Sequence, residues 1–391
     1  MLAFLKRSLF SNLTFVFGVY AVLMMFATVR ITLFEGSNNY AIFYYSLSHL
    51  IDGTNLYALY PAEYLDRYHY APSFPALVAP IFWFPYAVGL FIWQLLFAAV
   101  WVYAVYRLPL TQGQKVFAYW FALHELFTSI VNSQTNPFIA AIPIFVYLCF
   151  EKQRPSWAAF LLIVGFYIKI YSLVGAALFL LYPGQRVRFI AYMAFWAVAL
   201  GLMPLVFTSP ASLLEQYRWW VEELFLKSDS DKWINTSIHR ILHLFVSPNI
   251  PTAAIIGGGV VLFCTVYAQI RRFSEHTFRM LLLASILIFQ VIFNPIAESP
   301  VYIVAVTGVL IWWFASPQTG LDRALLIACF VLTVVSKSDI FPDVLRDRYV
   351  LPYVLRAFPC ALIWFRIIYL MHVPMAVQKP SDVELKPIEH R

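Results

Sequence analysis

A few polar residues stand out in a strongly apolar chain, and Glu298 is the one best suited to acid–base chemistry. It lies in residues 294–300, where Pro295 and Pro300 are expected to break the helix between two apolar runs. A carboxylate at such a break can accept a proton from a bound hydroxyl group, which makes Glu298 a candidate general base. The alternative is a solvated loop carboxylate without a chemical role, and both interpretations stay open at this point.

Lys169 is the candidate anion-binding residue. It is the one charged residue in the apolar stretch 157–182, and Tyr167 and Tyr171 lie on either side of it. An ammonium group at membrane depth needs either a negatively charged ligand or a route by which the side chain reaches water. The phosphate group of a lipid ligand would meet the first need, and snorkelling along the helix would meet the second.

Amide side chains gather in a turn at residues 132–137. Asn132, Gln134 and Asn136 fall between two apolar runs, and their amide groups can donate and accept hydrogen bonds with sugar hydroxyls. Asn, Ser and Pro also form good turns between helices without any ligand. A binding role and a purely structural role therefore both remain open for this turn.

A second amide pair, Asn38 and Asn39, precedes Tyr40 and a helix-like run at residues 41–51. Helix N-capping is the alternative to ligand binding for this pair, since Asn is a good N-cap residue. The run ends at Asp52, and the glycine that follows is typical of a helix stop and turn. Asp52 is therefore more readily explained by structure than by catalysis.

Arginines just ahead of the last apolar run are further candidates for phosphate binding. Arg346 and Arg348 are interleaved with Asp343 and Asp347 in a strongly charged segment at residues 336–349. The pair could bind a phosphate group of a lipid-linked substrate. Mutual salt bridges on a wet surface are the alternative interpretation.

Several common cofactor and metal motifs are absent from the sequence. There is no G-x-x-x-x-G-K-[ST], no G-x-G-x-x-G and no H-E-x-x-H, which disfavours an ATP-driven pump and a zinc protease of the usual type. Residues 229–231 read D-S-D, a tripeptide that arises often by chance. His124 and Glu125 are adjacent and point to different faces of a helix, so they do not form a metal-binding pair. We therefore expect neither a resident metal ion nor a cofactor.

The elements that carry these residues must be membrane helices. Of the 391 residues, 62% are hydrophobic and 12% are charged, whereas a soluble domain carries roughly 25% charged residues. The net charge of +7 comes from Lys and Arg residues scattered between apolar runs, which is a membrane-topology pattern and excludes a nucleic-acid-binding face. The four cysteines lie singly in apolar stretches and are expected to be small buried residues.

The spacing of the apolar runs predicts an all-α, polytopic membrane protein with about 10–12 transmembrane helices. We expect the stretch around Lys169 to form two short half-helices that meet near residues 169–171. The expected spans are at residues 13–33, 86–106, 116–131, 136–150, 189–207, 253–270, 278–293, 300–315, 321–336 and 350–371. We expect one transmembrane domain over residues 1–375 and a polar, disordered cytoplasmic tail at 376–391.

A single orientation of the chain in the membrane places most basic loops on one side and most acidic loops on the other. The positive-inside bias places the short basic loops, including Lys6, Arg107 and Arg186, on the cytoplasmic side together with the N-terminus. The acidic residues of the longer loops at 35–85 and 208–249 then fall on the outer side, together with Glu298 and the acidic residues of the segment 336–349. Within the second of these loops, residues 212–221 are predicted to form a helix lying in the membrane interface.

The amino-acid sequence of these loops resembles that of a known enzyme family. The motifs N-Y-A-I-F-Y-Y at 39–45, D-G-T-N-L-Y at 52–57 and Y-H-Y-A-P at 68–72 resemble the first outer loop of glycosyltransferase family 87. The turn Q-T-N-P at 134–137 and the segment Y-I-K-I-Y at 167–171 are similar to two further elements of that family. The resemblance extends over roughly residues 14–372.

The resemblance implies a GT-C fold and transfer of a hexose, with mannose expected, from a polyprenyl-phosphate donor. The acceptor would be a glycolipid or glycan on the periplasmic face of a bacterial inner membrane, and the anomeric carbon would be inverted without a metal or nucleotide. Relatives carry Asp at the position of Asn39, and an amide cannot accept the proton. Glu298, Asp52 and Glu63 are therefore the candidate bases.

The remaining roles follow from the same resemblance. Lys169, Arg346 and Arg348 would bind the donor phosphate. The sugar or the acceptor would be bound by Asn38, Asn39, Tyr40, His69, Tyr70, Asn132, Gln134, Asn136 and Tyr171. Two alternatives stay open, a transporter or flippase for lipid-linked sugars and a catalytically inactive binder of them.

Overall fold

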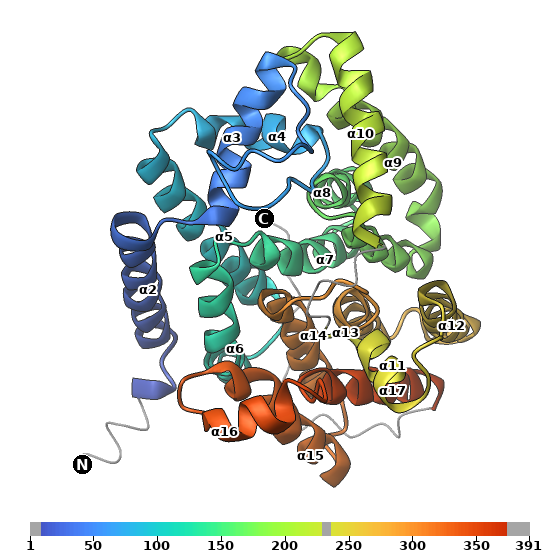
Figure 1. The fold of residues 1–391 in the computed structure, drawn as a ribbon. Coiled ribbons are helices and arrows are strands. Elements are labelled where there is room, and N and C mark those ends of the chain that lie inside the picture. The colour runs from blue at the N-terminus through green and yellow to red at the C-terminus, as the bar shows by residue number, and fades with distance from the viewer. Residues whose placement is uncertain (1–8, 229–235, 374–391) are drawn as a thin grey trace.

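The computed structural model describes residues 9–228 and 236–373, and every regular element in this part of the chain is a helix. The predicted tail at 376–391 and the D-S-D tripeptide at 229–231 lie outside the described residues. Figure 1 shows the described helices gathered into one bundle. The prediction of an all-α membrane protein is confirmed.

The expected spans are helical at the predicted positions. Within residues 9–228 and 236–373, three apolar segments are long enough to cross a membrane, namely Leu13–Glu35, Tyr86–Arg107 and Pro183–Val206, and eight shorter apolar helices have 10–17 residues. The matching elements are α2 (Leu13–Arg30), α5 (Tyr86–Arg107), α6 (Gln112–Val131), α7 (Asn136–Glu151), α9 (Arg186–Gly201), α12 (Thr252–Cys264), α13 (His276–Ile292), α14 (Tyr302–Ala315), α15 (Gly320–Ala328) and α17 (Ala357–His372).

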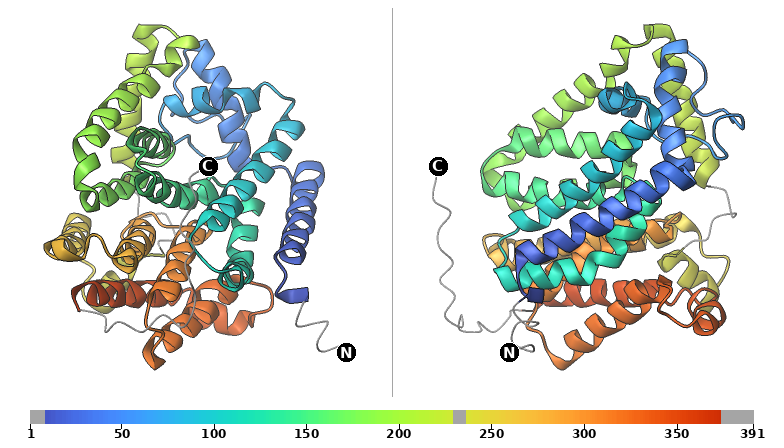
Figure 2. Two further views of the ribbon diagram at one scale, coloured as in Figure 1. Left: turned by 180° about the vertical axis from the view of Figure 1, so that it is seen from behind. Right: turned by 90° about the vertical axis from the view of Figure 1, so that its left-hand side faces the viewer.

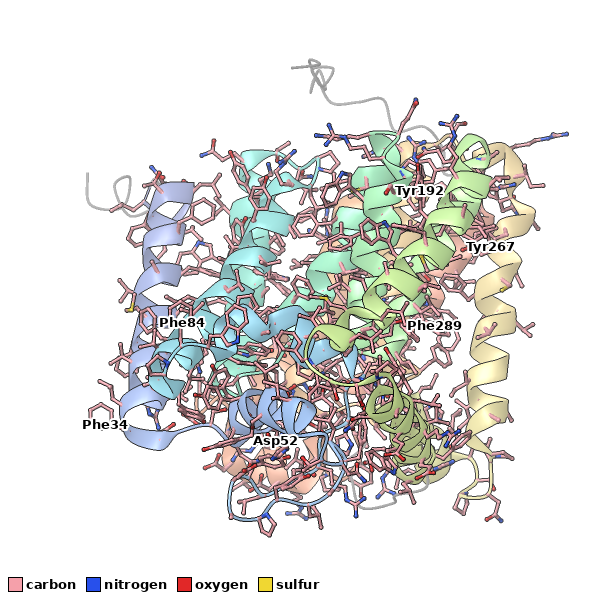
Figure 3. All side chains as sticks on the ribbon, turned by 90° about the horizontal axis from the view of Figure 1, so that it is seen from above. Phe34, Asp52, Phe84, Tyr192, Tyr267 and Phe289 are labelled. Carbon is pink, nitrogen blue, oxygen red and sulfur yellow. The ribbon has the colours of Figure 1, made fainter. Side chains whose placement is uncertain are left out.

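The two ends of the bundle carry the segments that the sequence assigns to opposite sides of a membrane. Figure 3 shows Phe34 and Asp52 towards one end of the helices, and Tyr192 and Tyr267 towards the other. The former two belong to segments predicted to face outward, and the latter two lie near predicted cytoplasmic loops. Which end faces the cytoplasm stays a prediction.

The centre of the bundle is the pair α13 and α14, whose residues are nearly all buried. Gly308 of α14 lies at their closest approach. A Cβ atom at this position would lie 2.7 Å from the backbone oxygen of Ala284, so only glycine permits this separation. Small residues at such contacts are a usual device in membrane helix packing.

The helix break at Lys169 is present. Helix α8 (Pro155–Ile168) ends there, the Lys169 backbone is extended (φ −143°, ψ 115°), and the 3-10 helix η2 (Ile170–Leu181) follows. The two pieces pack against each other, since a Cβ at Gly175 in η2 would lie 3.0 Å from Leu162 in α8. The predicted pair of half-helices is thus confirmed.

Loop helices cover one part of the bundle. Helices α3 (Asn38–Asp52), α4 (Ser73–Phe82) and α10 (Pro210–Ser228) lie on the side away from α15 and α17, as the views in Figures 1 and 2 agree. Helix α10 contains the predicted interface helix. The short helices α11 (Ile238–Phe245) and α16 (Asp343–Leu345) lie on the other side, with α17.

The boundaries of α3 correct one expectation and confirm another. Ser37, and neither Asn38 nor Asn39, is the N-cap, because its hydroxyl oxygen accepts a hydrogen bond from the Tyr40 N–H over 3.2 Å. N-capping as the alternative role of the Asn pair is therefore wrong. The helix ends as predicted, with Gly53 in the left-handed region at φ 69° directly after Asp52.

Candidate functional site

A cavity of about 590 Å³ opens among the loop helices and the ends of the membrane helices. Its wall is built by segments far apart in the sequence: the start of α3, the loop between α3 and α4, the α6–α7 turn, the break at Lys169, helix α10 and the segment 294–301. Nine of the residues singled out from the sequence line it: Asn39, His69, Tyr70, Asn132, Gln134, Asn136, Lys169, Tyr171 and Glu298.

Four singled-out residues of the first loop and α3 are not among the lining residues. The Asn38 side chain accepts a hydrogen bond from the Leu65 N–H over 2.7 Å. Tyr40 is fully buried among aromatic rings, edge-on to Trp93 at 5.7 Å between ring centroids. The other two are Asp52, which is exposed at the end of α3, and Glu63, which lies 2.9 Å from the ring nitrogen Nε2 of His49.

The two arginines singled out near the last span also lie away from the cavity wall. Arg346 is paired with Asp343 at 2.5 Å and with Asp347 at 3.2 Å. The guanidinium group of Arg348 lies 5.5 Å from the ring centre of Tyr349. These contacts favour the salt-bridge interpretation for Arg346.

Lys169 is placed in the wall by the helix break. Its Nζ donates a hydrogen bond to Oδ1 of Asn136 over 2.6 Å and lies 5.9 Å from the ring centre of Tyr171. The Tyr171 hydroxyl is buried and makes no hydrogen bond with any described residue. Because the backbone is extended at Lys169, its side chain is released from a helix face and the ammonium group can take part in the cavity.

Glu298 lines the cavity from a segment whose neighbouring residues, Ala297 and Ser299, are both held by hydrogen bonds. On one side, the N–H and the hydroxyl of Thr236 both donate to the backbone oxygen of Ala297, at 2.9 Å each. On the other side, the guanidinium group of Arg356 donates to the Ser299 hydroxyl. Between these anchors, the half-buried Glu298 carboxylate makes no hydrogen bond or ion pair with the described residues.

Tyr70 lies close to Glu298 in the same wall. Its ring stacks on Phe74 at 5.0 Å and meets Phe43 edge-on at 4.9 Å. Burial, together with the nearby Glu298 carboxylate, raises the pKa of Tyr70, so the phenol stays protonated and can donate a hydrogen bond.

Glu223, a buried carboxylate that was not selected from the sequence, contacts two residues of this wall. Glu223 of α10 lies 2.8 Å from Nδ1 of His69 and 3.4 Å from Nη1 of Arg67. Burial alone would raise the pKa of Glu223, but the interactions with His69 and Arg67 outweigh it and hold the pKa below its usual value. Glu223 is therefore ionised and orients the His69 ring.

Helical spacing indicates that Glu223 is buried, although it does not identify the residue that Glu223 contacts. Gln216, Trp220 and Glu223 recur at intervals of four and three residues, which places them on one face of α10, and that face is buried. Seven further lining residues with polar or charged groups were also not selected from the sequence: Asp66, Arg67, Trp220, Thr236, Asn294, Ser299 and Lys337.

An ion pair deep in the bundle lies next to the cavity. Nη2 of Arg356 lies 2.5 Å from Oε1 of Glu125, and both side chains are buried. The guanidinium group also donates to the backbone oxygen of Thr333 over 3.0 Å and lies 4.3 Å from the ring centre of Tyr302. This pair is the interhelical contact in which Glu125 takes part.

No group of three or more His, Cys, Asp or Glu side chains within the described residues is arranged to hold a metal ion. The donors and acceptors of the cavity wall instead include amides, tyrosines, lysines and single carboxylates, besides Arg67, His69 and two hydroxyl side chains. This set suits a ligand that combines hydroxyl groups with a negative charge.

The fold and cavity thus define a polytopic, all-α membrane protein with a cavity that is built from loop segments and helix ends and carries amide, tyrosine, lysine and carboxylate groups. The sequence model of glycosyltransferase family 87 matches residues 68–295, more than half of the chain, and the chain belongs to this family. It is accordingly a membrane glycosyltransferase. The match covers the turn at 134–137 and Lys169, but Asn39 and Glu298 lie outside it. No curated protein matched the chain in a sequence search.

Proposed function

We propose that this protein transfers a hexose, with mannose expected, from a polyprenyl-phosphate donor to a glycolipid or glycan acceptor. The proposal places the reaction on the periplasmic face of a bacterial inner membrane. The observation that carries it is a single cavity whose wall contains both a lysine at a helix break and a carboxylate without a described partner, Lys169 and Glu298.

The donor phosphate would lie against Lys169. The bond between the anomeric carbon and the phosphate oxygen breaks during transfer, and the phosphate leaves with one more negative charge than it had in the donor. An ammonium group held in a half-buried wall stabilises that growing charge more than it would in water. Asn136, which accepts a hydrogen bond from Lys169, would fix the direction of the ammonium group.

The acceptor hydroxyl would lie against Glu298. Its oxygen attacks the anomeric carbon from the face opposite the phosphate, which inverts the configuration, and Glu298 takes the proton. Of the three carboxylates predicted from the sequence, Glu298 is the one that lines the cavity, whereas Asp52 and Glu63 do not. This position is the reason to propose it as the general base.

The sugar would be bound by amides and a phenol. Gln134, Asn136 and Asn132 present hydrogen-bonding groups from the α6–α7 turn, and Tyr171 adds a hydroxyl without a described partner. A sugar ring offers hydroxyls that match both donors and acceptors of this kind. No metal or cofactor is part of the proposed reaction.

Asn39 is the observation that favours one alternative function, that of a catalytically inactive protein that binds lipid-linked sugars. Its side-chain amide donates to the backbone oxygen of Asn132 over 2.8 Å, so the position used as a base by relatives cannot accept a proton in this chain. The alternative differs from the proposal only in the role of Glu298.

Reconstituted protein distinguishes these functions. Liposomes containing the purified protein, polyprenyl-phosphate-[³H]mannose and a mixed pool of membrane glycolipids should form labelled glycolipid. A carrier would instead move the donor between leaflets without forming product, and an inactive binder would retain the donor without either result. Both of these outcomes would contradict the proposal.

A further inference from the structure

Lys337 belongs to the charged segment at residues 336–349, ahead of the last span, and its side chain lines the cavity. It ends a continuous helical stretch that begins with α15 and runs through the π-helical turn η8 (Cys329–Val334) and the 3-10 turn η9 (Val335–Lys337). Its half-buried side chain lines the cavity wall, whereas Arg346 and Arg348, nine and eleven residues further on, do not.

Three arginines near the cavity are each paired with a carboxylate, and Lys169 donates a hydrogen bond to the Asn136 amide. Arg67 is paired with Glu223 at 3.4 Å, Arg346 with Asp343 at 2.5 Å, and Arg356 with Glu125 at 2.5 Å. Lys337 differs, since its ammonium group has no hydrogen bond and no carboxylate within 4.0 Å among the described residues. This wall of the cavity therefore carries a positive charge that the described protein groups do not balance.

Keeping such a charge in a half-buried site costs free energy unless an anion compensates it. Burial, together with the charges of Arg356 and Arg346, lowers the pKa of Lys337, and the charges of Glu125 and Asp347 oppose this only in part. An anion bound in the cavity would reverse the effect and favour the charged ammonium group. The site is thus electrostatically prepared for a negatively charged ligand.

We infer that Lys337 binds the phosphate of the lipid donor as a second cationic ligand besides Lys169. The inference rests on the proposed function, because it assumes that the cavity holds a lipid-linked phosphate. The donor phosphodiester carries one negative charge, and the departing lipid monophosphate carries up to two. A second ammonium group therefore stabilises the transition state and the lipid phosphate product more than it stabilises the bound donor.

The test uses Lys337→Met, which keeps the length of the side chain but removes its charge, and Lys337→Arg, which keeps the charge. Arg323→Ala is the matched control, because Arg323 is an exposed cation near the start of the same helical stretch. The measurements are kcat, the KM values for donor and acceptor, and the inhibition constant of polyprenyl phosphate.

We expect Lys337→Met to lower kcat about 100-fold, the order seen when one transition-state charge contact is removed. The inhibition constant of polyprenyl phosphate should rise at least tenfold, the acceptor KM should stay within twofold, and Lys337→Arg should retain most activity. Thermal unfolding of Lys337→Met should match the wild type, since no described ion pair is lost. Unchanged kcat and inhibition in a folded Lys337→Met protein would overturn the inference, as would a change confined to the acceptor KM.

A direct binding measurement separates this inference from the proposed function. Polyprenyl phosphate is titrated into the detergent-purified wild-type and Lys337→Met proteins and binding is followed by calorimetry. Suppose that the wild type transfers no sugar but binds polyprenyl phosphate, and that Lys337→Met does not bind polyprenyl phosphate. The phosphate site is then supported, whereas the proposed reaction is wrong. If transfer occurs but both proteins bind polyprenyl phosphate equally, the reaction stands and the role of Lys337 is wrong.

Discussion

The side-chain amide of Asn39 donates a hydrogen bond to the backbone oxygen of Asn132 over 2.8 Å and thereby joins the start of α3 to the α6–α7 turn. An ionised aspartate has no proton to donate at this position and would place its carboxylate against a carbonyl oxygen. Asn39 is therefore a structural donor in the cavity wall.

Replacing Asn39 with aspartate should test this role. Asn39→Asp loses the hydrogen bond and introduces repulsion, so we expect it to lower the free energy of unfolding by about 1–3 kcal/mol. It should not raise the rate of transfer. Thermal unfolding and the transfer assay measure the two effects. A tenfold faster transfer without loss of stability would instead mean that this position is the general base site and that Glu298 is not.

Glu298→Gln removes the proposed general base while keeping the size of the side chain. We expect kcat to fall by roughly 10²–10⁴-fold, the usual contribution of general base catalysis, with little change in the donor KM. Glu215→Gln is the matched control, because Glu215 is an exposed carboxylate on α10 away from the cavity wall. Initial rates at saturating donor give the comparison.

The same assay decides between the three carboxylates predicted from the sequence. If Glu298→Gln retains full activity while Asp52→Asn or Glu63→Gln abolishes it, the base lies outside the cavity described here. Such a result would require the loop between α3 and α4 to move during the reaction, since Glu63 lies against His49 in this structure.

Apolar runs made the membrane helices predictable, because a span must stay largely apolar along its length wherever it packs. The break at Lys169 was also predictable, since a lone lysine in a long apolar stretch and the positive-inside bias pointed to the same place. N-capping by Asn38 or Asn39, one of the two interpretations that the sequence left open, is wrong because Ser37 directly before them accepts the capping hydrogen bond.

The cavity wall was predictable where a residue stood out against apolar neighbours, as Lys169 and Glu298 do. The cavity wall was not predictable where a side chain contacts a residue that lies far away in the sequence. Glu223 contacts a histidine more than 150 positions away, and Lys337 rather than Arg346 reaches the cavity because Asp343 and Asp347 hold Arg346 in the loop. Single-sequence patterns carry no information about such pairings.

Removing Arg356 should be among the most destabilising single changes. Arg356→Ala leaves the buried Glu125 carboxylate without its partner, and we expect a loss of about 3–5 kcal/mol. The double variant Glu125→Leu/Arg356→Met removes both charges and should recover most of that loss. Thermal unfolding in detergent measures both variants. A double variant no more stable than Arg356→Ala would show that the buried charge is not the cause.

The pairing of Glu223 with His69 and Arg67 predicts a pH effect on stability. Because the pKa of Glu223 is lower in the folded protein than the usual value of about 4.3, its ionisation stabilises the fold above that pH. This stabilisation should be lost as the pH falls through the folded-state pKa. The melting temperature should fall less between pH 6 and pH 3 in Glu223→Gln than in the wild type. Equal slopes would contradict the assignment.

The central claim is that one cavity holds both the group that binds the phosphate and the group that takes the proton. The most direct test is release of polyprenyl phosphate and formation of labelled glycolipid by the purified wild type, Lys169→Ala and Glu298→Gln, each with EDTA. We predict equal amounts of both products from the wild type and loss of both in each folded variant. Wild-type protein that binds the donor but forms neither product, or variants that form both at the wild-type rate, would contradict the claim.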